Sequence, residues 1–285
     1  QQFPLADPLQ GVQLERVEQP LAEWERWAPA TLDGSEGGFA RARQVLGRFL
    51  EERLPYYAEH RSEPSQDYAS GLSPYLHFGH ISPHQVLDEL GKREDWSLDK
   101  LNYRPTGSKD GSWGMSSNAE SFLDELVTWR ELGYNMCHFR DDYDRYESLP
   151  QWARNTLEEH ASDPREHIYS LEEFEEGRTH DRLWNAAQRQ LREEGRIQNY
   201  IRMLWGKKVL EWTRHPREAL QILVELNNKY ALDGRNPNSY SGIFWCLGRY
   251  DRPWFKRPIF GVIRYMSCES AARKFKLDGY LKRWS

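Results

Sequence analysis

The sequence predicts a mostly α-helical fold, and two observations carry that prediction. Apolar residues recur every three or four positions in several segments, which places them on one face of a helix. No segment shows a convincing alternation of apolar and polar residues, the pattern typical of a half-buried strand, and no internal repeat is present. At 285 residues the chain is long enough to bury a sizeable core in one large helical domain or two smaller ones.

The first part of the chain predicts a linker followed by a helix. Residues 1–35 contain proline and glutamate, show weak periodicity and end in a glycine-rich stretch, so we predict a linker there and a helical domain over residues 36–285. An amphipathic helix begins at Phe39, and Tyr56, Tyr57 and the polar stretch 62–66 end it. Residues 70–79 place hydroxyl side chains and glycine ahead of an apolar turn, as in a phosphate-binding helix start; an ordinary N-cap is the alternative.

The middle of the chain alternates helices and loops. A helix is expected over residues 83–90, because serine and then proline precede its apolar positions. Residues 95–118 contain several glycines and predict a long loop. Residues 120–134 predict a helix that holds Glu125 and Trp129 one turn apart on the same face.

The second half is also helical. Residues 140–178 alternate charged and short apolar pieces, and the sequence gives no clear element boundaries there. One helical region is expected over 184–212, and another over 216–228, where proline stands at the first position. A turn-dense loop over 232–238 then precedes a helix that begins near Tyr240.

Three tryptophans stand out among the 12 in the chain. Trp205 and Trp212 are two helical turns apart and therefore project from one side of a helix, and Trp184 lies near the start of the same helical region. An indole can donate an electron, so the series could carry reducing equivalents from the surface to a buried redox cofactor. Large core residues that only pack are the alternative, and for any single tryptophan this is the more common role.

Charge is distributed unevenly. The net charge of −5 does not suggest a nucleic-acid-binding protein. Residues 249–285, however, hold ten Lys or Arg and three acidic residues, a net charge of +7, interleaved with aromatic residues. Such a stretch suits a phosphate backbone with bases stacked nearby, and a solvated charged face is the alternative.

Other classes of protein are disfavoured. No run of about 18 apolar residues exists, so a membrane span is not expected. Cys137, Cys246 and Cys268 are widely spaced without a Cys/His cluster, so neither a metal site nor a disulfide framework is expected. The first residue is Gln and no signal-peptide pattern is present. We therefore expect an intracellular protein, cytoplasmic and nucleoid-associated in a bacterium or archaeon, and treat the chain as a possible part of a longer product.

Six segments in order resemble the FAD-binding catalytic domain of the photolyase/cryptochrome family, and most closely its class II cyclobutane pyrimidine dimer photolyases. They are SGLSPYLHFG (70–79), FLDEL (122–126), LWNAAQ (183–188), RMLWGKKVLEW (202–212), LDGRNPN (232–238) and PIFGVIRYM (258–266). The resemblance extends from about residue 39 to residue 284. The α/β domain that usually precedes this region in the family, and often holds an antenna chromophore, is absent from the sequence.

The resemblance implies FAD as the cofactor and assigns residues to it. It implies that Arg202 pairs with Asp233 beside the isoalloxazine and that Asn227 faces flavin N5, where an amide can donate or accept a hydrogen bond. Asn238, in the same loop as Asp233, is a weaker candidate. The residues that match the family's cofactor site are Tyr57, Ser70, Gly71, Leu72, Ser73, Asn199, Arg202, Asn227, Asp233 and Asn238.

The resemblance also assigns an electron route. It implies that Trp205 is the flavin-proximal indole, Trp184 the middle one and Trp212 the exposed end, so that the flavin can be reduced by light.

On the substrate side, Glu125 matches the acid that contacts the carbonyl edge of the pyrimidine dimer, and Trp129 and Trp245 match the aromatic walls of the lesion pocket. With Asn227 these are the candidate catalytic residues. An ion pair of Glu125 with Arg130, or a bond to nearby backbone, is the alternative.

The activity implied is light-driven repair of cyclobutane pyrimidine dimers in ultraviolet-damaged double-stranded DNA, by electron transfer from reduced FAD and without a metal. Arg252, Lys256 and Arg257 are candidate DNA contacts, and a monomer is expected. Two other functions remain open: a cryptochrome-type flavin photoreceptor without repair activity, and a binding module that kept the fold without the flavin.

Overall fold

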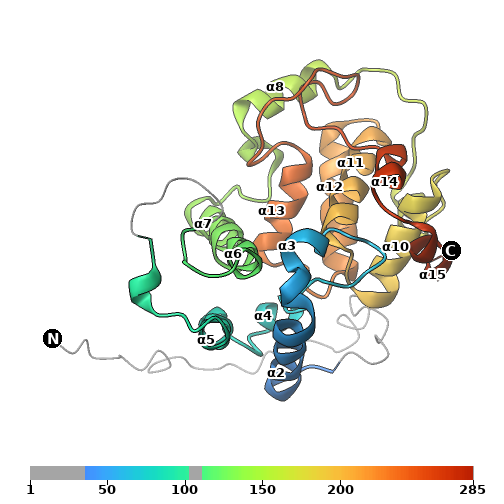
Figure 1. The fold of residues 1–285 in the computed structure, drawn as a ribbon. Coiled ribbons are helices and arrows are strands. Elements are labelled where there is room, and N and C mark those ends of the chain that lie inside the picture. The colour runs from blue at the N-terminus through green and yellow to red at the C-terminus, as the bar shows by residue number, and fades with distance from the viewer. Residues whose placement is uncertain (1–35, 103–110, 285) are drawn as a thin grey trace, which may run out of the picture.

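The computed structural model describes residues 36–102 and 111–284 of the chain, and within these ranges it is built of helices without a β-sheet (Figure 1). A single isolated bridge joins Arg257 to Gly261. The prediction of a mostly α fold is therefore confirmed. The predicted linker over 1–35 lies outside the described residues.

The first half contains α2 to α7. Their bounds are α2 (Phe39–Arg48), α3 (Tyr57–His60), α4 (Ser73–His77), α5 (Pro83–Arg93), α6 (Ser117–Leu123) and α7 (Arg130–Phe139). Two π-helical segments, η1 (Phe49–Arg53) and η4 (Asp124–Trp129), continue α2 and join α6 to α7. Short 3-10 turns are η2 (Leu54–Tyr56), η3 (Leu98–Lys100) and η5 (Tyr146–Ser148). The helix predicted from Phe39 and the helix predicted over 120–134 are both present, each with a π-helical turn that no sequence period predicts.

The second half contains α8 to α15. Their bounds are α8 (Gln151–Glu159), α9 (Leu171–Glu175), α10 (Arg182–Glu194), α11 (Asn199–Glu211), α12 (Pro216–Tyr230), α13 (Pro237–Cys246), α14 (Cys268–Lys274) and α15 (Asp278–Arg283). Figure 1 shows α13 lying between α6 and α7 on one side and α11 and α12 on the other.

Several boundaries differ from the prediction, three of them in the second half of the chain. The region 184–212 is two helices, because Gly195 ends α10 in the left-handed conformation, at φ 66°. The helix predicted to close at residue 228 continues to Tyr230. The helix expected from Tyr240 begins at Pro237, because the side chain of Asn236 accepts a hydrogen bond from the amide of Asn238 at 3.0 Å and so caps it.

The interior consists of two apolar clusters. The smaller one gathers residues of α2, α5 and α6 with the segments that join them, among them Leu46, Phe49 and Phe122. The larger one is formed mainly by α10 to α13 and the C-terminal segment, and includes Trp184 and Phe244. The predicted apolar faces of the helices are buried in these clusters, which is the usual source of helix stability in a folded protein.

Helix α11 approaches α13 closely at Gly206. A Cβ atom at this position would collide with the Sγ atom of Cys246 and lie 3.3 Å from its Cβ atom. Because Gly206 is helical and buried, it serves here for the close approach of two helices and not for an unusual backbone angle. In the described part of the chain, no helix is long and apolar enough to cross a membrane.

We expect Gly206→Ala to lower the free energy of unfolding by about 1–3 kcal/mol, because the added methyl group overpacks the contact with Cys246. Urea denaturation measures the change. Gly242→Ala in α13 is the matched control, because nothing lies within 4 Å of the added Cβ atom. This control is expected to be neutral or stabilising by up to about 1 kcal/mol. An unchanged stability of the Gly206→Ala protein would contradict the packing argument.

Candidate functional site

Two adjoining cavities hold most of the candidate site residues. The first cavity, about 340 Å³, lies between the loop that follows α3 and the helices α10, α11 and α15. Six of the ten candidate cofactor residues line it: Tyr57, Ser70, Gly71, Ser73, Asn199 and Arg202. The second cavity, about 400 Å³, is lined by Trp129, Trp245 and Asn238 among others. Glu125, Asn199 and Arg202 line both cavities, so the two spaces meet at these three side chains.

The segment 70–73 borders the first cavity with its backbone and hydroxyl groups. Gly71 adopts φ 70°, a left-handed conformation that glycine reaches without strain. The hydroxyl of Ser70 accepts a hydrogen bond from the amide of Leu72 at 3.3 Å. The side chain of Leu72 is buried in the smaller apolar cluster and does not line the cavity, so this residue anchors the segment. Ser73 begins the short helix α4.

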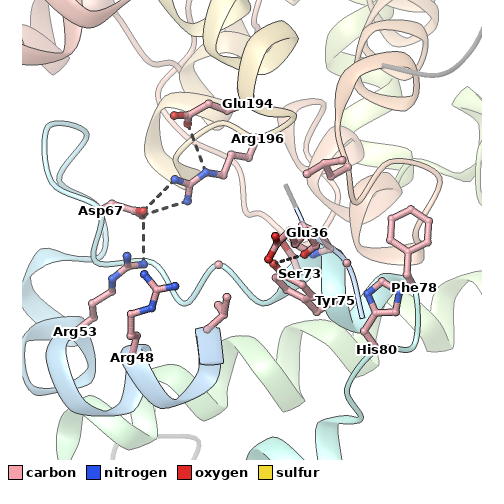
Figure 2. A pocket seen from close by; sticks show the side chains of 15 residues that line it. Glu36, Arg48, Arg53, Asp67, Ser73, Tyr75, Phe78, His80, Glu194 and Arg196 are labelled. Atoms are coloured by element: carbon pink, nitrogen blue, oxygen red, sulfur yellow. Dashed lines mark hydrogen bonds and ion pairs between the residues drawn. The ribbon is translucent and has the colours of Figure 1, made fainter. Parts of the chain in front are cut away.

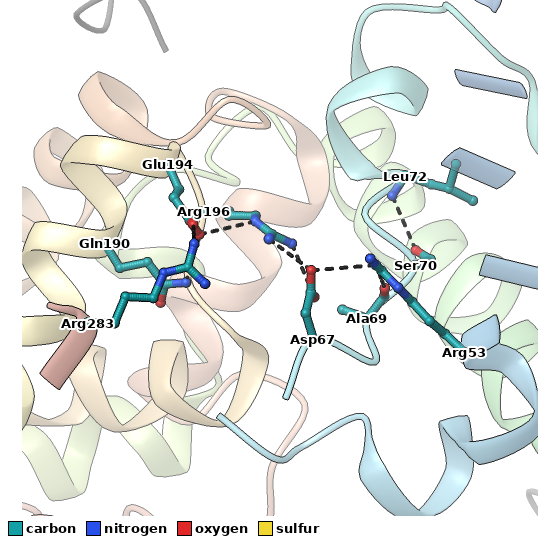
Figure 3. A network of polar contacts seen from close by, with 9 residues as sticks. All are labelled: Arg53, Asp67, Ala69, Ser70, Leu72, Gln190, Glu194, Arg196 and Arg283. Atoms are coloured by element: carbon teal, nitrogen blue, oxygen red, sulfur yellow. Dashed lines mark hydrogen bonds and ion pairs between the residues drawn. The ribbon is translucent and has the colours of Figure 1, made fainter. Parts of the chain in front are cut away.

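A chain of charged groups crosses the mouth of the first cavity (Figure 3). The Asp67 carboxylate lies between two guanidinium groups, at 3.5 Å from Arg53 and 3.0 Å from Arg196. Glu194 pairs with Arg196 at 3.5 Å and also with Arg283. The chain therefore links the loop after α3 to the turn between α10 and α11 and to α15.

A third cavity of about 400 Å³ lies on the other side of this chain (Figure 2). It shares Asp67, Ser73 and Arg196 with the first cavity and adds Arg48 and Tyr75 to the lining. The first and third cavities are thus two parts of one cleft, and the ion-paired side chains of Asp67, Arg196 and Glu194 stand between them.

Arg202 and Asp233 form the ion pair that the resemblance implies. The Nη2 atom of Arg202 donates to Oδ1 of Asp233 at 3.2 Å, and about a quarter of each side chain or less is exposed. The pair joins α11 to the loop before α13, and Arg202 carries it to the boundary of both cavities. His77 faces the same carboxylate. Burial lowers the pKa of His77, and the negative charge of Asp233 only partly opposes that effect.

Asn227 lies near this pair but lines none of the three cavities described above. It is buried on α12, and its Nδ2 atom donates to Oδ1 of Asn228 at 3.4 Å. Asp233 does not line these cavities either and reaches them only through Arg202. The assignment of Asn227 to flavin N5 therefore stays a prediction.

Glu125 is held by Arg61. The Nη1 atom of Arg61 donates to Oε1 of Glu125, which places the carboxylate where the two cavities meet. Arg130, the alternative partner expected from the sequence, instead lies over the ring of Tyr134, with its guanidinium carbon 4.0 Å from the ring centroid. Burial, followed by the nearby charge of Glu125, raises the pKa of Tyr57 to about 12. Tyr57 is therefore a neutral hydrogen-bonding group at physiological pH.

An aromatic wall closes one side of the second cavity. The rings of Trp129 and Trp245 are 4.5 Å apart between centroids and tilted by 40°, so they touch and form one continuous wall. Tyr250 packs edge-on against both at 6.3 Å. The Trp129 indole donates to Asp124 at 3.1 Å, whereas the buried Nε1 atom of Trp245 has no partner in the structure.

The three tryptophans of the predicted electron route are in contact. The rings of Trp184 and Trp205 are stacked, with centroids 6.2 Å apart and an interplanar angle of 9°, and Trp212 lies edge-on to Trp184 at 6.2 Å. Trp205 is three residues after Arg202 and one helical turn from it. The order Trp205, Trp184, Trp212 therefore leads away from Arg202 and the two cavities.

Two details of the route were predicted wrongly. Trp184 belongs to α10 and not to the helix of Trp205, so the stacking arises from the packing of two helices. Trp212 is not an exposed end, since 5% of it is accessible. His180 covers it, with ring centroids 4.8 Å apart, and Tyr169 lies beside it at 5.9 Å.

The predicted DNA-contacting residues lie on an irregular hairpin over residues 250–266. The amide of Trp254 donates to the carbonyl of Val262, and that of Arg257 donates to the carbonyl of Gly261. Arg252, Lys256 and Arg257 are exposed, and Lys256 pairs with Glu159 at 2.6 Å. Not every cation of the basic stretch faces solvent: Arg249 is buried and donates to Ser148 and to the carbonyl of Tyr143.

Several site residues were missed by sequence reasoning. Arg61 lies one helical turn after Tyr57, and that spacing was the available signal. Phe255, at 89% exposure, is the most exposed large apolar side chain of the described residues, and its neighbour Trp254 is 38% exposed. Two other missed residues, Tyr250 and Arg264, stand near the two ends of the hairpin and line the second cavity.

The chain is similar to known photolyases along most of its length. It is 41% identical over 258 residues to the deoxyribodipyrimidine photo-lyase of Methanothermobacter thermautotrophicus, covering 90% of this chain and 53% of that protein. It is 40% identical over 269 residues to the enzyme of the same name from Arabidopsis thaliana, covering 94% and 49%. The chain spans about half the length of the curated relatives it matches. No family model matches the chain.

Solved structures show the same fold. A class III photolyase from Agrobacterium tumefaciens superposes with a TM-score of 0.65 at 20% identity, over 93% of this chain and 50% of that one. A cryptochrome from Synechocystis sp. PCC6803 superposes with a TM-score of 0.63 at 18% identity, over 88% and 46%.

The helical architecture is the fold of the helical half of these solved photolyase and cryptochrome structures. The sequence similarity to several photolyases over most of this chain confirms its resemblance to the photolyase/cryptochrome family.

We expect Asp233→Asn to lower the free energy of unfolding by about 1–3 kcal/mol, because it leaves the partly buried guanidinium of Arg202 without its counter-ion. Urea denaturation measures this, and Asp99→Asn at an exposed position is the control. The double variant Arg202→Met/Asp233→Asn should cost less than the sum of the two single variants, since the two residues interact directly. Strict additivity would show that the pair contributes nothing.

Proposed function

We propose that this chain catalyses the light-driven repair of cyclobutane pyrimidine dimers in DNA and that FAD is its cofactor. The observation that carries the proposal is the meeting of the first and second cavities at Glu125, Asn199 and Arg202. A cofactor in the first cavity and a lesion in the second would contact the same three side chains. The similarity to several photolyases at 40–42% identity supports the reaction.

The residues of the first cavity fit FAD. The diphosphate of such a cofactor needs hydrogen-bond donors and positive charge. The segment 70–73 offers hydroxyl and amide groups, and Arg196 and Arg53 bring two guanidinium groups to the mouth of the same cleft. The residues that would hold the cofactor are Tyr57, Ser70, Gly71, Ser73, Asn199 and Arg202, with Leu72 anchoring the segment and with Asn227, Asp233 and Asn238 as further candidates.

When bound, FAD would supply light-driven one-electron chemistry, which no side chain of this chain supplies by itself. The protein's own groups bind and orient. Arg202, fixed by Asp233, keeps a positive charge between the cofactor and substrate spaces. Glu125, fixed by Arg61, presents a carboxyl group to the carbonyl edge of a pyrimidine in the second cavity. Asn227 would act through its amide, which can donate or accept.

The second cavity would receive the dimer flipped out of the duplex. Flipping costs a few kcal/mol and costs less for a damaged base that already stacks poorly. A base that stacks on an aromatic side chain regains about 1–3 kcal/mol. The joined rings of Trp129 and Trp245 provide such a surface.

The hairpin 250–266 would contact the DNA around the lesion. Arg252 and Arg257 are exposed cations suited to phosphate groups, and the ion pair of Lys256 with Glu159 leaves that lysine a weaker contact. Phe255 projects into solvent beside them. An exposed apolar side chain in this place is suited to fill the space that a flipped base leaves in the duplex. Because Tyr250 and Arg264 line the second cavity, DNA on this hairpin would lie over its opening.

The finer assignment is to the class II photolyases. The chain is 40–42% identical to enzymes from an archaeon, two plants and a marsupial, but 24–29% identical to those of several bacteria, which supports one branch of the family. We further propose that residues 36–285 act as one catalytic domain. We propose that the protein repairs DNA as a monomer and acts inside the cell, where its DNA substrate is found. A preceding antenna domain is compatible with the helical core described above.

The central test is repair of a dimer-containing oligonucleotide by the flavin-loaded protein under blue light. Glu125→Gln is expected to slow repair by about 10- to 100-fold, because it removes a charged hydrogen-bonding group from the substrate cavity. The flavin absorption band should stay unchanged. Glu131→Gln, at an exposed position in α7, is the matched control.

No light-dependent repair by the wild-type protein would contradict the proposed function. A protein that binds flavin and changes its spectrum with light but repairs nothing would instead support the cryptochrome alternative.

The electron route is tested separately. Trp205→Phe is expected to abolish reduction of bound flavin by light, since it removes the indole nearest to Arg202. Repair by protein whose flavin was reduced chemically beforehand should remain. Absorption spectroscopy follows the first reaction. Trp96→Phe is the control; this residue lies just after the end of α5, and its indole donates to the carbonyl of Trp113. Full photoreduction in the Trp205→Phe protein would exclude this route.

A further inference from the structure

Lys207 is a fully buried lysine that the repair reaction described above does not use. Its relative exposure is 0%, and it follows Gly206 in α11, where that helix packs tightly against Cys246 of α13. Burying an ammonium group is costly unless it is hydrogen-bonded. Its position therefore needs an explanation.

The ammonium group reaches the C-terminal end of α13. Nζ donates to the carbonyl oxygen of Cys246 at 2.7 Å and lies 3.5 Å from that of Trp245. These are the last two residues of the helix, whose carbonyl groups have no partner within the helix itself. A cation at this end also interacts favourably with the helix dipole.

The second nearby cation does not serve these carbonyls. Arg249 lies with its guanidinium over the ring of Phe244, 3.8 Å from the centroid, and donates to Ser148 and to the carbonyl of Tyr143. Arg264 lies with its guanidinium carbon 5.0 Å from the ring centroid of Trp254. Among the described residues, Lys207 is therefore the cation that bonds to the carbonyls at the end of α13.

The end of α13 carries the wall of the substrate cavity. Trp245 is the residue whose carbonyl Lys207 approaches, and its ring packs on Trp129 at 4.5 Å. We propose that Lys207 is a positioning residue that fixes Trp245, and with it the lesion-binding wall, by capping the end of α13. The expected effect of Lys207 on DNA binding rests on the proposed function. The hydrogen bonds by which Lys207 caps α13 do not depend on it.

Charge makes the cap sensitive to pH. Burial lowers the pKa of Lys207 to about 8, against the opposing influence of Cys246 and Asp251, and Arg264 lowers it further. Burial also raises the pKa of the Cys246 thiol, which therefore stays neutral in this range. The ammonium group, which donates a stronger hydrogen bond than the neutral amine, is thus lost as pH rises through about 8.

Global stability responds in the opposite direction. The unfolded chain keeps this lysine protonated up to its ordinary pKa near 10.5, so between about 8 and 10.5 the unfolded state binds more protons than the folded one. The Lys207 contribution to the unfolding free energy therefore rises with pH over this window. As pH rises, loss of the Lys207 charge should therefore loosen the end of α13 while the free energy of unfolding increases. A residue with only a general structural role would not produce these two opposite changes.

The first experiment needs no ligand. Amide hydrogen exchange of Leu247, Gly248 and Arg249 reports the end of α13, because these amides bond to the carbonyls of Phe244 and Trp245. Lys207→Met should speed their exchange about tenfold or more, as expected for the loss of a charged hydrogen bond, without affecting α12. Lys207→Gln, whose neutral amide still donates, should restore part of the protection.

The control is the neighbouring lysine. Lys208 is also buried but pairs with Glu211 and faces Trp212, so Lys208→Met should leave the exchange at residues 247–249 unchanged. Wild-type protection at these amides, corrected for the intrinsic exchange rate, should fall as pH passes about 8. This last measurement needs no variant and decides the matter if Lys207→Met fails to fold.

The second experiment measures the dissociation constant for dimer-containing and undamaged oligonucleotides between pH 6.5 and 9, a range of about one unit or more on each side of the Lys207 pKa. The wild-type preference for damaged DNA should decrease above about pH 8, and Lys207→Met should show a weak, pH-independent preference. The inference would be overturned if the Lys207→Met protein kept wild-type protection of amides 247–249 and the wild-type pH dependence of the preference for damaged DNA. If the wild-type protein does not prefer damaged DNA at any pH, the proposed function fails, and hydrogen exchange alone decides whether Lys207 caps α13.

Discussion

The close packing of α13 against α11 is the constraint on which the rest of the site depends. Gly206 leaves room for Cys246, and the next residue, Lys207, bonds to the end of α13. The same two helices carry Arg202 and Trp245, which line the second cavity. A shift of one helix against the other would therefore change the charge at the meeting point of the cavities and the position of the aromatic wall together.

Ion pairs between distant segments set the shape of the space around these helices. Arg61 holds Glu125, and Asp233 holds Arg202, so each charged group that faces both cavities has a fixed partner behind it. A paired side chain loses little further freedom when a ligand binds, which is how a site is organised before binding. The chain that includes Asp67 and Arg196 does the same at the mouth of the first cavity, where a diphosphate would need positive charge.

The three tryptophans in contact and the exposed cationic hairpin lie on different parts of this framework. Trp184, Trp205 and Trp212 are buried in the larger apolar cluster, whereas the hairpin 250–266 exposes cations and the ring of Phe255. Arg202 stands between the two, since Trp205 is one turn further along its helix and Arg264 of the hairpin lines the same cavity. A charged side chain at the meeting point of the two cavities and the first of the three tryptophans thus lie on one helix, α11.

The sequence alone determined the helical class, most helix positions and the residues that match the family. These depend on spacing within one segment, where positions three or four apart are neighbours and apolar faces are visible as a period. The ion pair of Arg202 with Asp233 came from the resemblance, and the structure confirms it. The placement of Asn227 against a flavin stays a prediction.

Only the tertiary structure decided which segments meet. Glu125 pairs with Arg61, which is 64 residues away in the sequence. Asp67 pairs with Arg196, 129 residues away in the turn before α11, and Lys207 bonds to the carbonyl of Cys246, 39 residues further along. It also showed that Trp212 is buried and that Trp184 and Trp205 stack across two helices. Such contacts follow from how whole helices pack, and no period within a single segment records that packing.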